Sequence, residues 1–140
     1  MKSSKKGKKS IASIVAKNPN FSTLLFALQE ADLVGALKGR GPFTVFAPTN
    51  EAFEKLPEGA LDSLLNDKEA LKNVLLFHVV GEKLSSSKVA NLDYVTMLNG
   101  TVAEIDLSDE GVFIQNSQIT AFDVKARNGI VHVIDEVILP

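Results

Sequence analysis

The sequence predicts an α+β fold built as a single domain, and three features of the chain indicate this class. Apolar residues recur at helical spacing over residues 10–79, and from Tyr94 onward they alternate with polar residues as they do in strands. The third feature is the closing run at residues 130–139, which is apolar, rich in β-branched residues, entered through Asn128-Gly129 and followed by a proline. Such a run is typical of a central strand that is covered on both faces.

Short helices are expected in the first half of the chain. Ser10 is suited to cap a helix that ends before Asn18-Pro19, and residues 21–37 carry an apolar stripe that should divide near Asp32 into a long and a short helix. Further helices are expected at residues 51–56, capped by Thr49 or Asn50, at residues 61–65, and at residues 68–79, opened by a capping box of Asn66 and Glu69.

The second half is expected to form an antiparallel sheet, which an earlier strand joins. The expected strands lie at residues 43–47, 94–98, 101–107, 112–115, 119–126 and 130–139. Asn99-Gly100 and Asn128-Gly129 predict tight hairpin turns, because Asn and Gly both tolerate positive φ. Side chains alternate along a strand, so His132 and Asp135 should point to opposite faces of the closing strand.

Composition and charge exclude several classes of function. The chain has 140 residues, 45% of them hydrophobic and 23% charged, as expected for one ordinary globular domain. Five lysines lie within residues 1–9, which we expect to form a disordered leader, while residues 10–140 carry 10 basic and 17 acidic side chains. An acidic domain repels phosphate backbones, so nucleic acid is not expected as the partner.

The sequence pattern predicts neither an export signal nor a transmembrane helix. No stretch approaches the ~18 apolar residues of a transmembrane helix, and no apolar segment follows the Lys-rich start as it would in a signal peptide. Removal of a signal peptide and addition of a Lys-rich leader would leave this pattern. Cysteine is absent, which excludes disulfides and thiolate chemistry and leaves the compartment open.

The two histidines are expected to be structural. His78 lies on an apolar stripe and His132 stands between two valines, where a neutral imidazole usually bonds to a backbone group. An alternative is a metal or small-ligand site near His78 and His132 that also uses Asp135. The sequence has no closely spaced pair of histidines, such as His-x-x-x-His, that would preorganise a metal site. We therefore expect no metal ligand and no cofactor.

Asp135 is expected to be buried, and a buried carboxylate needs donors. The expected donors are backbone N–H groups or the side chains of Thr49 or Asn50, which would attach the first strand to the last. No Gly-x-Ser-x-Gly elbow and no phosphate-binding loop is present, so no catalytic residue is assigned and the chain is not expected to be an enzyme.

Three stretches together resemble the fasciclin (FAS1) domain family: Phe43 to Phe53, the pair Phe77-His78, and Asn128 to Pro140. Their order and spacing match that family over residues 10–140. The resemblance implies a wedge in which a β-sandwich-like antiparallel sheet carries the N-terminal helices at one side. It also implies a secreted or cell-surface protein of the extracellular matrix type that acts in cell adhesion.

The resemblance also implies partner-binding positions. In animal matrix members, integrin binding is assigned to a Tyr-His segment and to an Asp-Ile pair, and here Phe77-His78 and Asp123-Val124 stand at those places. The expected function is a non-catalytic, monomeric protein-interaction module whose partner is an extracellular or cell-surface protein or glycan. Two alternatives remain open: a small-ligand or metal-dependent protein using His78 and His132, and a structural domain whose partner is its own copy.

Overall fold

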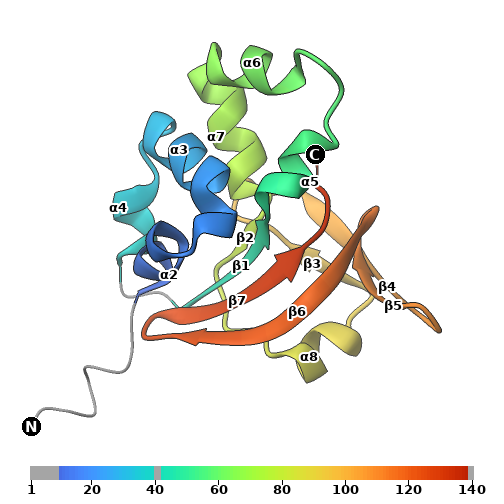
Figure 1. Ribbon diagram of the computed structural model, residues 1–140. Helices are drawn as coiled ribbons and strands as arrows, with labels where there is room; N and C mark the ends of the chain where they lie inside the picture. The colour runs from blue at the N-terminus through green and yellow to red at the C-terminus, as the bar shows by residue number, and fades with distance from the viewer. Residues whose placement is uncertain (1–9, 40–41, 139–140) are drawn as a thin grey trace, which may run out of the picture.

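The computed structural model describes residues 10–39 and 42–138, and it places all the described helices except α8 at one side of a nearly closed seven-stranded sheet (Figure 1). The helices are α2 (Ile11–Lys17), the 3-10 turn η1 (Pro19–Phe21), α3 (Ser22–Glu30), α4 (Val34–Leu37), α5 (Asn50–Glu54), α6 (Ala60–Leu65), α7 (Lys68–Leu76) and α8 (Ser86–Ala90). The strands are β1 (Phe43–Pro48), β2 (Val79–Val80), β3 (Tyr94–Thr96), β4 (Val102–Ser108), β5 (Gly111–Ile114), β6 (Ser117–Ala126) and β7 (Gly129–Ile134). The predicted α+β class is confirmed. The expected leader, residues 1–9, lies outside the described residues.

The sheet has the strand order β2-β1-β7-β6-β5-β4-β3. Every pairing is antiparallel except that of β1 with β7, which is parallel and runs in register from Phe43 opposite Gly129 to Pro48 opposite Ile134. The β7 strand therefore lies inside the sheet, as expected for the closing run. The simple expectation of an antiparallel sheet missed this one parallel pairing.

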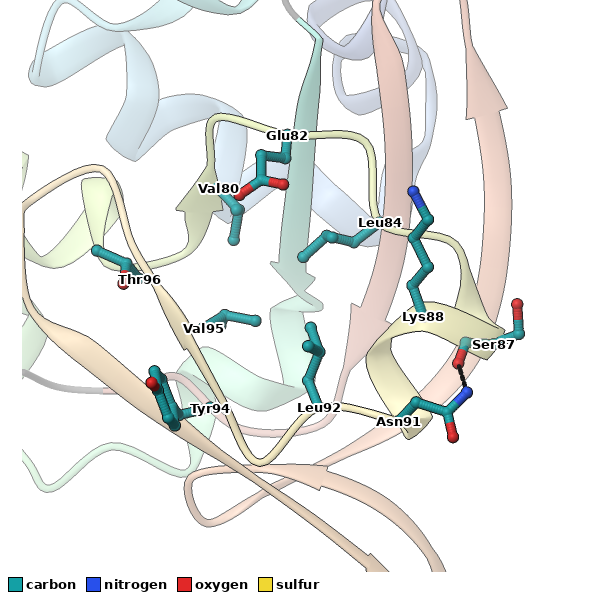
Figure 2. Close-up of a pocket in the computed structure, with 10 residues that line it drawn as sticks. All are labelled: Val80, Glu82, Leu84, Ser87, Lys88, Asn91, Leu92, Tyr94, Val95 and Thr96. Atoms are coloured by element: carbon teal, nitrogen blue, oxygen red, sulfur yellow. Dashed lines mark hydrogen bonds between the residues drawn. The ribbon is translucent and has the colours of Figure 1, made fainter.

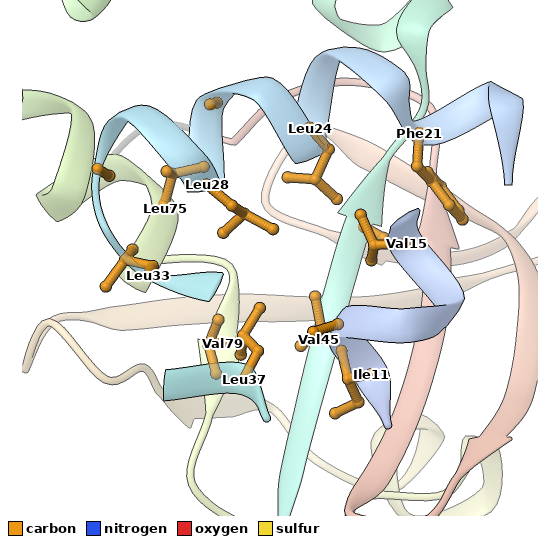
Figure 3. Close-up of a cluster of buried hydrophobic side chains, with 14 of the residues drawn as sticks. Ile11, Val15, Phe21, Leu24, Leu28, Leu33, Leu37, Val45, Leu75 and Val79 are labelled. Carbon is orange, nitrogen blue, oxygen red and sulfur yellow. The ribbon is translucent and has the colours of Figure 1, made fainter. Parts of the chain in front are cut away.

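Both faces of β1 and β7 are covered, and each face builds a separate core. On one face, Val45 and Val131 pack in a cluster with side chains of the helices, and Figure 3 shows Val45 close to Ile11 of α2, with residues of α3 and α7 in the same cluster. On the other face, Phe46 and Ile134 pack with side chains of β3, β4 and α8. The prediction of a closing strand covered on both faces is confirmed. The strand itself is shorter than expected, because β7 ends at Ile134 and the chain then bends.

Helix boundaries follow the capping residues closely. The Ser10 hydroxyl accepts a hydrogen bond from the Ser13 N–H group, and α3 and α4 are separated around Asp32, whose φ is 64°. The α7 helix is capped by Asp67, whose side chain accepts from the Ala70 N–H group, so the cap lies one residue after the expected Asn66. This helix ends at Leu76 rather than near Val79, because Val79 is already paired in β2.

The turn between β6 and β7 is fixed by the buried amide of Asn128. Its Oδ1 accepts from the Ile11 N–H group at 3.0 Å, and its Nδ2 donates to the carbonyl oxygens of Leu37 at 2.7 Å and Gly39 at 2.8 Å. Its backbone carbonyl accepts from the Phe43 N–H group at 2.9 Å. One residue therefore joins the start of α2, the end of α4 and the start of β1 to the hairpin. The sequence indicated only the turn.

Candidate functional site

His78 is buried at the end of α7, where both of its ring nitrogens are used. Nε2 accepts from the Ile138 N–H group at 3.1 Å, so the proton is on Nδ1, which donates to the Val74 carbonyl at 2.8 Å. Burial lowers the pKa of His78 from 6.5 to about 4. The ring is therefore neutral at physiological pH and connects α7 to the chain that follows β7.

The lowered pKa of His78 makes stability depend on pH in a defined direction. The unfolded chain binds a proton near pH 6.5 and the folded chain only near pH 4, so protonation favours unfolding. This contribution to stability is fully present above pH 6.5 and is lost as the pH falls toward 4. It amounts to about 3 kcal/mol.

His132 is fully buried in the middle of β7. Its Nε2 lies 2.7 Å from the Leu84 carbonyl oxygen and donates to it. The ring contacts the rings of Phe46, in a tilted arrangement, and of Phe122, in an edge-to-face arrangement, with 5.6 Å between centroids in each pair. His132 thus holds the segment that follows β2 against the sheet.

A metal or ligand site at the histidines gains no support from this arrangement. Among residues 10–39 and 42–138, no group of three or more His, Asp or Glu side chains is placed to hold a metal ion. Both rings are buried and bonded to backbone groups, so a metal would have to replace those bonds. No contact of the two histidines therefore favours the alternative of a ligand-binding protein that uses them.

Asp135 follows β7 and is less buried than expected, with its side chain 33% exposed. Its Oδ1 accepts from the Gln118 N–H group at 2.9 Å and from the Ser117 hydroxyl at 3.3 Å, and Lys55 lies 4.0 Å from Oδ2. The expected backbone donor is present. The carboxylate therefore joins the end of β7 to the start of β6.

Thr49 and Asn50 are not the donors to Asp135, which corrects the expectation. The Thr49 hydroxyl caps α5 by accepting from the Ala52 N–H group at 3.3 Å. Asn50 accepts from the Thr23 N–H group at 2.9 Å and donates to the Pro19 carbonyl at 2.9 Å. Thr49 therefore caps α5, and Asn50, the first residue of that helix, attaches it to the start of α3 and to η1.

Phe77 and His78, the first pair of expected partner-binding residues, are both buried. Phe77 belongs to the core that contains Phe46 and Ile134, and His78 is bonded as described above. The Phe side chain needs no polar partner, so it fits a fully apolar setting better than a Tyr would. In this conformation a partner on this face would contact neighbouring residues rather than these two side chains.

The second expected pair lies on an open edge of β6. The β5 strand pairs only with Ser117 and Gln118 of β6, so within the described chain the residues that follow have no strand partner on the side away from β7. We call residues 119–126 the β6 edge. Phe122 and Val124 are 36% and 37% exposed on it. The backbone of Asp123 belongs to β6, and its side chain lies outside the described part.

The structure also contains a groove that the sequence analysis did not identify (Figure 2). It has a volume of about 510 Å³ and lies between β3, α8 and the chain that follows β2. Four apolar residues line it, namely Val80, Leu84, Leu92 and Val95, with Glu82 and Lys88 also in its lining. We call this the β3 groove. In the sequence, two large residues close together after α8, Leu92 and Tyr94, are a signal for it, and the structure shows that both are exposed.

The described helices are short. The longest of them, α3 and α7, have nine residues each, and none in this part of the chain has the length and apolar character needed to cross a membrane.

Comparison with known proteins places these features in a family. The Fasciclin domain model matches residues 19–140. Protein sll1483 of Synechocystis is 44% identical over 132 residues, which cover 93% of this chain and 73% of that protein. Cell surface glycolipoprotein MPB83 of Mycobacterium bovis is 33% identical over 135 residues, covering 93% of this chain and 60% of the relative. The fold is similar to the FAS1 domain pair of the insect cell adhesion molecule Fasciclin I, with a TM-score of 0.71, 23% identity, and coverage of 87% and 46% of the two chains.

Proposed function

The chain belongs to the fasciclin domain family, and from this premise we propose that it is a non-catalytic adhesion module that binds an extracellular protein or glycan through its outer surface. Its relatives include a cell surface glycolipoprotein, and its fold is that of domains in a cell adhesion molecule. These relatives support a secreted or cell-surface location for the native form, in contact with extracellular matrix or other cells. We expect the module to act as a monomer.

The observation that supports this proposal is the contrast between the interior and the β6 edge. Within the described residues, every buried side-chain nitrogen and oxygen has a hydrogen-bond partner, so the interior polar groups are already used by the fold. Phe122 and Val124, in contrast, stand partly exposed on a strand edge. Burying such apolar area against a partner contributes about 25 cal/mol per Å² before the costs of association.

Val124→Asp is the variant that tests this role of the β6 edge. We expect the variant to capture about tenfold less partner than the original chain, because a charge at the centre of an apolar contact must be desolvated. The measurement is the amount of material that the immobilised protein retains from an extracellular fraction of the organism that encodes it. Asp123→Ala is assayed beside it, because Asp123-Val124 is the pair that the family resemblance indicates.

Leu107→Asp is the matched control, because Leu107 is an exposed apolar residue on β4 rather than on the β6 edge. This variant should capture as much as the original chain. Circular dichroism and thermal melting would establish that all variants are folded. Equal capture by Val124→Asp and Leu107→Asp would remove the β6 edge as the contact, and equal capture by Asp123→Ala would remove Asp123 alone.

A further inference from the structure

We propose that the β3 groove binds an extended peptide segment of a partner protein, which adds as a strand to the free edge of β3. The inference rests on the proposed function and specifies the kind of partner, but it concerns a different surface from the β6 edge. The two outermost strands of the sheet are β2 and β3, and Val79 of β2 accepts a backbone hydrogen bond at 2.8 Å from the N–H group of Leu98, two residues after the end of β3. Beyond this bond the two chains separate, and the groove lies between them (Figure 2).

The hydrogen-bond pattern of β3 shows which of its backbone groups face the groove. Met97 donates to the Thr101 carbonyl, and the Asp93 carbonyl accepts from Ile105, so the odd-numbered residues face β4. In an antiparallel pair the facing residues alternate, so the N–H and C=O groups of Tyr94 and Thr96 point away from β4. Leu98 bonds to β2 in that same direction. Two donors and two acceptors, spaced at about 7 Å, are therefore presented to the groove.

The wall opposite β3 is held in place by polar contacts with the centre of the sheet. The Thr44 hydroxyl of β1 accepts from the Leu84 N–H group at 2.7 Å and donates to the Glu82 carbonyl at 2.6 Å. His132 of β7 donates to the Leu84 carbonyl at 2.7 Å. Because β1 and β7 both hold this segment, the groove is formed before a ligand arrives, which lowers the cost of binding.

The lining of the groove is suited to contact the side chains of a bound extended segment. Side chains alternate along a strand, so every second residue of a bound segment would face the apolar residues Val80, Leu84, Leu92 and Val95. The lining has one acidic residue, Glu82, and one basic residue, Lys88, and so carries no net charge. A segment with small apolar residues at alternate positions and no strong charge is the complementary ligand.

A single extended segment fits the groove better than a second copy of this chain. The groove has walls on both sides, β3 on one and α8 with residues 82–84 on the other. A second folded copy that approached through its own β3 would bring its β4 strand and α8 helix against these walls. An isolated strand brings only its backbone and its alternating side chains.

Thr96→Pro removes one donor from the groove and leaves the bonds between β3 and β4 intact. Proline has no N–H group, and the N–H group of Thr96 is the one that points away from β4. The experiment selects displayed random eight-residue peptides on the original protein and then measures their affinity for each variant. We expect the enriched peptides to carry alternating apolar residues and to bind Thr96→Pro about tenfold more weakly. Thr96→Val, which keeps the N–H group, should bind them as well as the original chain.

Hydrogen exchange gives a second measurement that a different binding mode would not reproduce. The amide protons of Tyr94 and Thr96 should exchange more slowly when a selected peptide is bound, while those of the β6 edge should not change. If Thr96→Pro does not fold, Leu92→Glu places a charge in the groove instead, and it should also weaken binding about tenfold. Val124→Asp should bind the peptides normally, so failure of the β6 edge proposal and failure of this one are distinguishable.

Three outcomes would overturn the inference. The first is a selection that enriches no peptide on the original protein. The second is equal affinity of the enriched peptides for the original protein and Thr96→Pro. The third is a dimer in sedimentation that Thr96→Pro abolishes, which would make a second copy the occupant.

Discussion

Asn128→Ala should lower the free energy of unfolding by about 4 kcal/mol. The substitution leaves the Ile11 N–H group and the Leu37 carbonyl without their partner in a buried setting, and it also removes the bond to the Gly39 carbonyl. Each stranded buried group costs about 1–3 kcal/mol, and alanine has no side-chain atom that can reach them. The expected effect is large because one amide connects two helices to the β6–β7 hairpin.

Urea denaturation followed by circular dichroism measures this loss, and Asn99→Ala is its matched control. Asn99 also precedes a glycine in a turn, but its Oδ1 accepts from the Thr101 N–H and hydroxyl groups in an exposed setting. Water can replace those bonds, so Asn99→Ala should cost about 1 kcal/mol or less. Equal losses for the two variants would show that Asn128 acts only as a turn residue.

Gly129→Ala is expected to lower the free energy of unfolding by about 3 kcal/mol. A Cβ atom at this position would lie 1.9 Å from the Phe43 carbonyl oxygen, and the parallel pairing of β1 with β7 sets that approach. The obstructing atom belongs to the backbone of a buried strand pair and cannot rotate away as a side chain could. Phe43 and Gly129, the first residue pair of the parallel β1–β7 pairing, would have to move apart.

Gly35→Ala provides the comparison for the glycine substitution. Gly35 lies in α4, and an added Cβ meets no atom within 4 Å, so alanine should stabilise the protein by about 0.5–1 kcal/mol through its better helix propensity. Chemical denaturation of both variants under the same conditions gives the difference. Unchanged stability of Gly129→Ala would contradict the close contact between β1 and β7.

Sequence patterns predict those helices and strands that are determined by residues close together in the sequence. Ser10 and Thr49 cap their helices through bonds to N–H groups three residues further on, and a capping residue followed by an apolar stripe reveals this spacing. Coverage of the closing strand on both faces follows from its apolar residues at both odd-numbered and even-numbered positions, which point to opposite faces. In each case the information lies within a few residues.

Features that depend on distant segments could not be predicted in this way. Nothing near Asn128 indicates that Ile11 and Leu37 will be its partners, which lie 117 and 91 residues away. A backbone donor to Asp135 was among the expected ones, but the sequence did not indicate that Gln118 would supply it rather than Thr49 or Asn50, because the approach of Gln118 depends on how β6 pairs with β7. The β3 groove depends on where β2 and β3 separate, which is a property of the whole sheet.

Both histidines are interior groups that hold the fold together, and the ring nitrogens of His78 report this role. Nitrogen-15 NMR of the imidazole reports the tautomer and the charge at each pH. We expect a proton on Nδ1, an unprotonated Nε2 that accepts from Ile138, and a neutral ring from pH 8 down to about pH 5, with no change when zinc is added. A ring that titrates near pH 6.5, or whose Nε2 signal shifts with zinc, would place His78 in an open site and contradict its role as an interior group.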